Sequence, residues 1–346
     1  MGRIDAGASR RSRASRFPAL LLAAVLVAAM LFPAVAASAG DGDGGQVVRL
    51  QLLAINDFHG ALQSRTLGGR PIGGAAVLAA YWDRWEQEAR KDGFTTLRVG
   101  VGDLVGASPP VSALLQDEPT IEALNRMHLL FSAVGNHEFD EGVAELRRLQ
   151  EGGCHPATGC FAGARFRYLT ANVVDAETGE PLFPPYAVVR VRGIPVGFIG
   201  VTLKETPTIV TPTGVAGLRF LDEAESVNRY VAELKRQGVE TIVVLLHQGG
   251  EGDRRGGPVT GAVVPIVAAM DDEVDVVLSA HTHRGYWGTV DGKLVTQAYS
   301  GGTAFADVDL VLDRATGDVI EKRARIVDTY ADVPPGTEPD KQIARL

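Results

Sequence analysis

Residues 47–59 read VVRLQLLAINDFH, an apolar run that ends in a carboxylate and an imidazole. The run from Val47 to Ile55 is almost continuously apolar and contains β-branched residues, which is typical of a strand buried on both faces. Asp57 and His59 follow where this strand is predicted to end. The stretch therefore predicts a central strand that delivers two polar side chains to one edge of a sheet.

The segments that follow alternate between helical and strand patterns. Residues 75–91 carry apolar side chains at the three-and-four spacing of an amphipathic helix. Similar patterns predict helices near 120–127 and at 141–150, 223–237 and 259–270, and strands at 95–101, 129–134, 241–246 and 274–279. Antiparallel hairpins are predicted at 186–201 and 305–327. The chain thus reads as a layered α/β domain with mixed sheets and outer helices.

The first 39 residues are typical of an export signal. Five arginines precede an apolar run from Ala19 to Phe32, Pro33 ends it, and Ala37-Ser38-Ala39 has the form that signal peptidase accepts. We expect cleavage after Ala39 and a secreted, cell-surface or periplasmic protein. An uncleaved anchor is the alternative, because about twenty apolar residues can span a bilayer. Residues 40–46, rich in glycine and aspartate, predict a flexible linker.

The chain is acidic, with a formal net charge of −8 over 346 residues. Removal of the signal, with its five arginines and one aspartate, would change this to −12. Negative charge opposes nucleic-acid backbones and anionic membrane surfaces, so we expect a small phosphate-bearing ligand, no nucleic acid and no stable membrane anchor. The sequence leaves the oligomeric state open.

The two cysteines, Cys154 and Cys160, lie close together in CHPATGC. In an exported chain this spacing predicts a disulfide that closes a short loop. A metal site with His155 is the weaker alternative, because no second pair of ligands lies nearby.

Four short segments place metal-ligand side chains at the ends of predicted strands, where open α/β sheets gather their sites. These residues are Asp57 with His59, Asp103 after Gly102, Asn136 after Gly135, and His281 with His283. The members of each pair are two positions apart, and in extended backbone such side chains point the same way, so one ion could contact both. Oxygen and imidazole ligands without thiolates favour Mn, Zn, Fe or Co.

Each segment alone is weak, because a lone histidine at a strand end is commonly a hydrogen-bonded core residue. The combination is more specific. In this order, DFH at 57–59, GD at 102–103, GNHEFD at 135–140, His247 and HTH at 281–283 resemble the calcineurin-like metallophosphoesterases, specifically the 5′-nucleotidase family. The resemblance covers roughly residues 47–330. The form Asn-His-Glu-Phe-Asp favours the nucleotidase branch, since many other members have Asn-His-Asp.

The resemblance implies a four-layer α/β/β/α sandwich with mixed sheets and a centre for two divalent ions. One ion would be held by Asp57, His59 and His283 and the other by Asn136, His247 and His281, with Asp103 bridging them. His137 would donate a hydrogen bond or a proton to the substrate phosphate, oriented by Asp140. Alternatively, Asp140 caps a helix that starts at Glu141. Glu138 is expected to support the turn rather than bind metal.

The predicted function is hydrolysis of nucleoside 5′-monophosphates to nucleoside and phosphate. Within the same family, 2′,3′-cyclic nucleotides and UDP-sugars are alternative substrates, and a thiosulfohydrolase-type activity is a more distant one. A catalytically silent extracellular binding module is the alternative of another class, but it would lack at least one ligand and all seven are present.

Two features depart from the family pattern. Ala280 stands where glycine usually precedes His-x-His, which changes backbone freedom more than ligation. Residues 331–346 are polar and rich in proline. We interpret them as a linker towards a C-terminal nucleotidase domain that is absent from this sequence.

Overall fold

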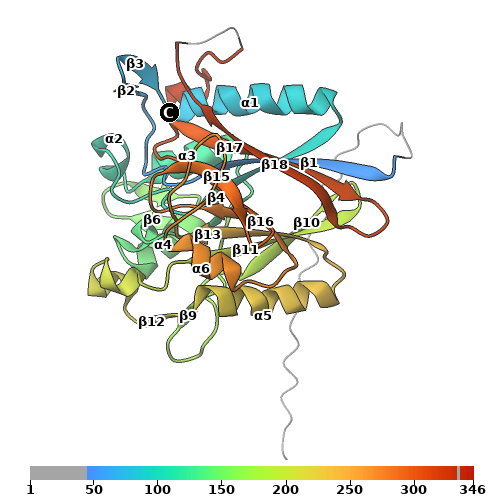
Figure 1. Cartoon of the computed structure of the whole chain (residues 1–346). Coiled ribbons are helices and arrows are strands. Elements are labelled where there is room, and N and C mark those ends of the chain that lie inside the picture. The colour runs from blue at the N-terminus through green and yellow to red at the C-terminus, as the bar shows by residue number, and fades with distance from the viewer. Residues whose placement is uncertain (1–44, 333–335) are drawn as a thin grey trace, which may run out of the picture. The chain divides into compact units, whose positions relative to one another are not determined.

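The computed structural model describes residues 45–332 and 336–346. The predicted signal at 1–39 lies outside the described residues, as does most of the predicted linker at 40–46. In the part of the chain that is described, no helix has both the length and the apolar character needed to cross a membrane. The longer strands of this part form two six-stranded mixed sheets (Figure 1).

The first sheet is built around the strand that opens the described chain. Its order is β18 (Val319–Asp328), β17 (Ala304–Asp313), β1 (Val47–Ile55), β4 (Phe94–Val101), β5 (Phe131–Ala133) and β8 (Arg167–Leu169). β1 pairs in parallel with β4 and antiparallel with β17. Leu53 and Ile55 pack towards the helices, whereas Leu50 and Leu52 pack towards the second sheet. The predicted strand with two buried faces is therefore confirmed.

The second sheet has a parallel centre and antiparallel edges. Its order is β10 (Tyr186–Val191), β11 (Ile194–Thr202), β13 (Thr241–His247), β14 (Val274–Ser279), β16 (Lys293–Ala298) and β15 (Gly285–Val290). The hairpin of β10 and β11 was expected from the sequence, whereas the strands β15 and β16 were not assigned. Both belong to the segment that follows the predicted histidine pair.

Helices cover the outer faces of both sheets (Figure 1). The first sheet packs against α1 (Ala75–Lys91), α3 (Glu118–Arg126) and α4 (Val143–Glu151), and the second against α5 (Glu223–Arg236) and α6 (Val263–Ala268). A third apolar cluster fills the space between the sheets. These three cores establish the predicted α/β/β/α layers. Helix α6 is shorter than predicted because Gly261, with φ of 95°, turns the chain just before it.

Short elements complete the described part of the chain. They are α2 (Pro110–Ala113), the hairpins β2 (Arg65–Leu67) with β3 (Arg70–Ile72) and β6 (Gly153–His155) with β7 (Gly159–Phe161), the pair β9 (Val173–Asp175) and β12 (Leu218–Phe220), and the 3-10 turns η1 (His137–Phe139), η2 (Thr206–Thr208), η3 (Pro212–Val215) and η4 (Ile343–Arg345).

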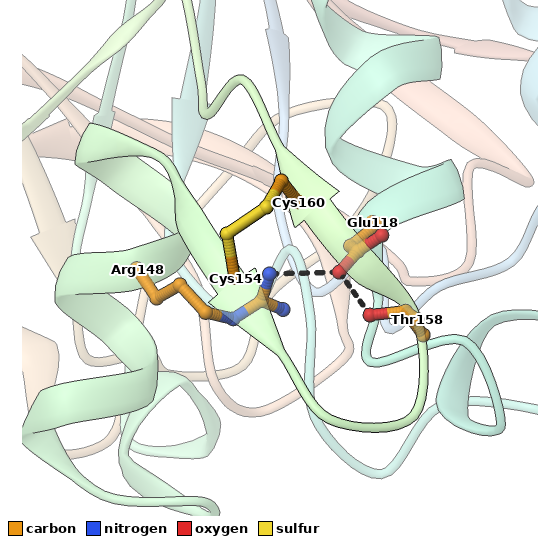
Figure 2. The surroundings of a disulfide bond; sticks show 5 residues. All are labelled: Glu118, Arg148, Cys154, Thr158 and Cys160. Carbon is orange, nitrogen blue, oxygen red and sulfur yellow. Dashed lines mark hydrogen bonds and ion pairs between the residues drawn. A yellow bond between two sulfur atoms is a disulfide. The ribbon is translucent and has the colours of Figure 1, made fainter.

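The predicted disulfide between Cys154 and Cys160 is present and joins β6 to β7 (Figure 2). The hydroxyl of Thr158 and the guanidinium of Arg148 both donate to the same carboxylate oxygen of Glu118, at 2.6 and 2.7 Å. Glu118 begins α3 and Arg148 lies on α4. Hydrogen bonds through Glu118 therefore connect the disulfide hairpin with two helices of the outer layer.

The segment 336–346 packs on α1. The side chain of Ile343 is buried in the apolar cluster of the first sheet, and the amide of Asp340 donates to the carbonyl of Ala76 at 2.8 Å. This packing differs from the free segment that the polar composition of the predicted linker at 331–346 suggests. That the segment leads to a further domain stays a prediction.

The carboxyl group of Asp275 on β14 gives stability a predictable dependence on pH. Burial raises the pKa of Asp275 to about 7, and the amide of Ile242 donates to its side chain at 3.0 Å. Because the folded pKa exceeds the unfolded one, ionisation of Asp275 costs stability as pH rises through 7. Asparagine keeps an acceptor for Ile242 without the charge. Asp275→Asn should stabilise the protein by about 1–2 kcal/mol at pH 8, a value discounted for partial solvent exposure, with no gain below pH 4.

Urea unfolding at the two pH values measures this difference. The control is Asp272→Asn, because the side chain of Asp272 is 99 % exposed. An equal gain from Asp275→Asn at pH 4 and pH 8 would contradict the assignment of the effect to ionisation.

Candidate metal centre

The seven predicted ligand residues lie at the carboxyl ends of strands from both sheets. Asp57, Asp103 and Asn136 follow β1, β4 and β5 of the first sheet, and His247, His281 and His283 end or follow β13 and β14 of the second, while His59 lies two residues beyond Asp57. Parallel neighbours in each sheet direct these ends to the same edge. The structure therefore brings the predicted site residues together.

Two groups of side chains each leave room for one ion. In the first, Nε2 of His283 lies 3.3 Å from Oδ1 of Asp57 and 3.3 Å from Nε2 of His59. In the second, Nε2 of His247 lies 3.2 Å from Oδ2 of Asp103, and one ligand atom from each of Asp103, His247 and His281 lies within 4.8 Å of the others.

Asp103 connects these groups, and Asn136 adds an oxygen to the second. Oδ2 of Asp103, besides its contact with His247, lies 3.8 Å from Nε2 of His59 in the first group. Oδ1 of Asn136 lies 3.2 Å from Nε2 of His247. Asp103 thus stands between the two groups, which is the place that a bridging carboxylate needs.

The hydrogen bonds of the imidazoles fit metal binding. Nδ1 of His247 donates to the carbonyl of Val101 at 2.7 Å, and Nδ1 of His59 donates to the carbonyl of Gly106 at 2.9 Å. Each Nε2 of the neutral ring then carries a lone pair that faces other acceptors. A proton or a metal ion between such acceptors relieves their repulsion, so the set of imidazole and oxygen ligands suits divalent ions.

The charges of the site support the same conclusion. Burial lowers the pKa of His59 and of His281, which favours the neutral form that binds metal. Burial also acts against a charge on His247, but Asp103 outweighs it and raises the pKa of His247 to about 10. Burial likewise opposes ionisation of Asp103, yet His247 keeps the pKa of this carboxyl below its usual value. A metal ion bound at this pair would release the proton that His247 holds.

The backbone of the ligands differs from the expectation. Asp57, His59, Asp103, His281 and His283 have φ between 49° and 72°, the left-handed region that few residues other than glycine adopt. The extended-backbone argument for the two pairs is therefore wrong. Because the chain turns within HTH, His281 and His283 join different groups instead of sharing an ion. Asp57 and His59 do share a group, but through the turn geometry.

Glu138 links two of the ligand loops by hydrogen bonds. Its buried carboxylate accepts hydrogen bonds from the amides of Asp103, Leu104 and Gly135, at 2.8, 2.7 and 2.6 Å. Burial, reinforced by the charge of Asp103, raises the pKa of Glu138 to about 7. The expectation that Glu138 supports the turn is confirmed, and the support extends to the loop that carries Asp103.

His137 lies beside the first group of ligands. Its ring centroid is 5.1 Å from that of His59, and its side chain is 35 % exposed. Nδ1 of His137 donates to Oδ2 of Asp140 at 2.8 Å, and this hydrogen bond raises the pKa of His137. The alternative role of Asp140 as a helix cap is wrong, because α4 begins at Val143 and Gly142 is its N-cap.

Sequence reasoning missed Asn56 as a link between the sheets. Its side-chain oxygen accepts from the amide of Ala298 on β16 at 2.9 Å, and its nitrogen donates to Asp57 at 2.6 Å. An asparagine beside a ligand gives no periodic signal, and the bounds of the strand that it contacts were not predicted. For Gln297 the sequence indicates a strand after the histidine pair and a position that could support the site, and Gln297 lies on this same strand, β16.

Comparisons with known proteins agree with this geometry. A family model described as calcineurin-like phosphoesterase matches residues 50–285. The chain is 39% identical to the endonuclease YhcR of Bacillus subtilis, over 82% of this chain and 24% of that protein. It is 38% identical to the cell wall protein Lmo0130 of Listeria monocytogenes, over 85% of this chain and 42% of that protein.

A 5′-nucleotidase precursor from Thermus thermophilus has a similar solved structure. It superposes with a TM-score of 0.67 and 27% identity, over 86% of this chain and 57% of that one. The chain thus spans less than half the length of the endonuclease and of the cell wall protein. With a matched domain that contains every predicted ligand, the chain belongs to the calcineurin-like phosphoesterase family.

Proposed function

We propose that this chain is an exported two-metal phosphoesterase that hydrolyses nucleoside 5′-monophosphates. The observation that carries the proposal is the pair of ligand groups, whose acceptor atoms face one another and share Asp103. The similarity to a 5′-nucleotidase supports the substrate class, and the similarity to a cell wall protein supports export.

In this proposal each group holds one divalent ion. Asp57, His59 and His283 bind the first, Asn136, His247 and His281 bind the second, and Asp103 contacts both. Mn, Zn, Fe and Co all suit these ligands. When bound, the ions supply an activated water and neutralise charge on the phosphoryl oxygens.

His137 is the proposed catalytic residue. Because Asp140 accepts the hydrogen bond from Nδ1, the other nitrogen of the ring is available to the substrate. The hydrogen bond with Asp140 raises the pKa of His137 and so favours the ring that is protonated on both nitrogens. In that form the exposed side chain beside His59 can donate a hydrogen bond or a proton as the leaving oxygen gains charge. Asp140 orients the ring.

Removal of metal tests the proposal. Protein treated with EDTA should release no phosphate from 5′-AMP, because the site residues include no serine or cysteine nucleophile, and added Mn should restore the activity with two ions per chain. Metal content by plasma mass spectrometry and phosphate release measure this. Undiminished activity in metal-free protein, or a single ion at saturation, would overturn it.

A second candidate is hydrolysis of phosphodiesters in nucleic acid, favoured by the 39% identity to an endonuclease. The acidic composition argues against nucleic acid as a partner, but a local site can accept the end or a loop of a nucleic-acid strand despite the net charge of −8. A panel of 5′-AMP, 2′,3′-cyclic AMP, UDP-glucose and single-stranded DNA and RNA separates the candidates. Two bound ions without hydrolysis of any member would favour the silent binding module.

A further inference from the structure

The side chain of Gln297 is enclosed by the loop that carries the histidine pair. Gln297 lies on β16, next to β14, and its exposed fraction is 1%. The loop from Ala280 to Arg284 follows β14 and passes over the end of this side chain. Because the amide of Gln297 contacts this loop, an effect of Gln297 on the site would act through the loop.

Every polar atom of the Gln297 amide has a partner in this loop. The oxygen accepts from the amides of His283 and Arg284, at 2.8 and 2.9 Å, and the nitrogen donates to the carbonyl of Ala280 at 3.0 Å. This orientation of the amide is the one that matches donors with acceptors, because the reverse orientation directs the oxygen at the carbonyl of Ala280.

The nitrogen of Gln297 extends the network to a second ligand segment. It also donates to the hydroxyl of Thr282 at 3.0 Å, and this hydroxyl donates to the carbonyl of Gly250 at 2.9 Å. Gly250 follows His247 by three residues. One buried side chain therefore connects the HTH loop with the segment that follows His247.

The loop needs such a restraint because its conformation is costly. His281 and His283 have φ of 72° and 54°, and each left-handed residue costs conformational free energy that neighbouring contacts must offset. This double turn is what directs the two imidazoles to different ligand groups. A relaxed, extended loop would place both side chains on the same side.

We propose that Gln297 is a positioning residue that sets the turn of the HTH loop, so that His281 reaches one ion and His283 the other. The inference rests on the proposed two-metal function and names the residue that pre-organises one ligand of each ion. It predicts that loss of the amide weakens the binding of both ions together.

Gln297→Met tests the inference, because methionine has nearly the same length and volume but cannot bond the loop amides. The affinities of both Mn ions, measured by calorimetry on metal-free protein, should fall roughly tenfold or more. Hydrogen exchange of residues 280–284 in the metal-free protein should become faster. Gln297→Glu keeps the acceptor for His283 and Arg284 and loses the donor. Its Mn affinities should therefore lie between those of the wild type and of Gln297→Met.

Thr296→Val is the matched control. Thr296 is equally buried on the same strand, and its hydroxyl donates to the carbonyl of Tyr286 at 3.0 Å, away from the HTH loop. Thr296→Val should lower the melting temperature but leave the Mn affinities and the hydrogen exchange of residues 280–284 unchanged. Unchanged Mn affinities in Gln297→Met would overturn the inference while the proposed function stands. Wild-type protein that binds no metal would overturn both.

Discussion

His137→Ala protein is expected to keep both metal ions and to lose about 10²–10⁴-fold in kcat, the usual contribution of a positioned acid or base. The imidazole is not within either ligand group, so its removal should leave the metals in place. What it removes is the donor beside His59 that meets charge on the phosphate or the leaving oxygen. Steady-state kinetics on 5′-AMP and metal content by plasma mass spectrometry measure the two effects separately.

The control for this variant is His128→Asn. His128 is exposed after α3 and has φ of 55°, a conformation that asparagine tolerates. Its activity should equal that of the wild type. A His137→Ala protein that retains both ions and hydrolyses 5′-AMP at the wild-type rate would remove His137 from the mechanism.

Of the variants proposed here, Glu138→Gln should have the largest effect on stability, and it should also weaken metal binding. Three backbone amides now donate hydrogen bonds to the carboxylate, and the single oxygen of a glutamine cannot accept all three. At least one buried N–H of Asp103, Leu104 or Gly135 therefore loses its partner. We expect a loss of about 2–4 kcal/mol at pH 8, where the carboxylate is charged. Because the loops of Asp103 and Asn136 then separate, metal affinity should fall roughly 10–100-fold.

Urea unfolding of the metal-free protein and Mn titration measure these losses. Glu141→Gln is the matched control, since Glu141 is an exposed residue of the same turn. Metal binding that is unchanged in Glu138→Gln would show that the two loops hold their positions without the carboxylate.

The fold was predictable where the pattern of side chains was strong. β1 and α1 have the predicted bounds, because Val47–Ile55 is almost continuously apolar and Ala75–Lys91 keeps one apolar stripe. The bounds of the strands β15 and β16 were not predicted, since Gly285 and Gly288 interrupt one and polar Thr296 and Gln297 are buried in the other. Their burial depends on tertiary hydrogen bonds, which no local window of sequence contains.

The candidate site was predictable in its residue types but not in its conformation. Ligands at strand ends could be named because parallel strands share an edge. The left-handed backbone of Asp57 and His283 could not be predicted, because Asp and His adopt this conformation more often than most residues but still uncommonly. The contacts of the supporting residues were equally hidden, since Asn56 bonds Ala298, 242 residues away, and Gln297 bonds the loop that follows β14.

The position of β1 has a consequence for how the protein is made. Its partner β17 begins at Ala304, and the ligand groups span from Asp57 to His283, so a nascent chain lacks this strand pair and a complete set of ligands until synthesis has passed these residues. A polypeptide translocated before it folds would therefore acquire its ions on the far side of the membrane. The metal supply of that compartment, rather than that of the cytosol, would then decide which ions the enzyme carries.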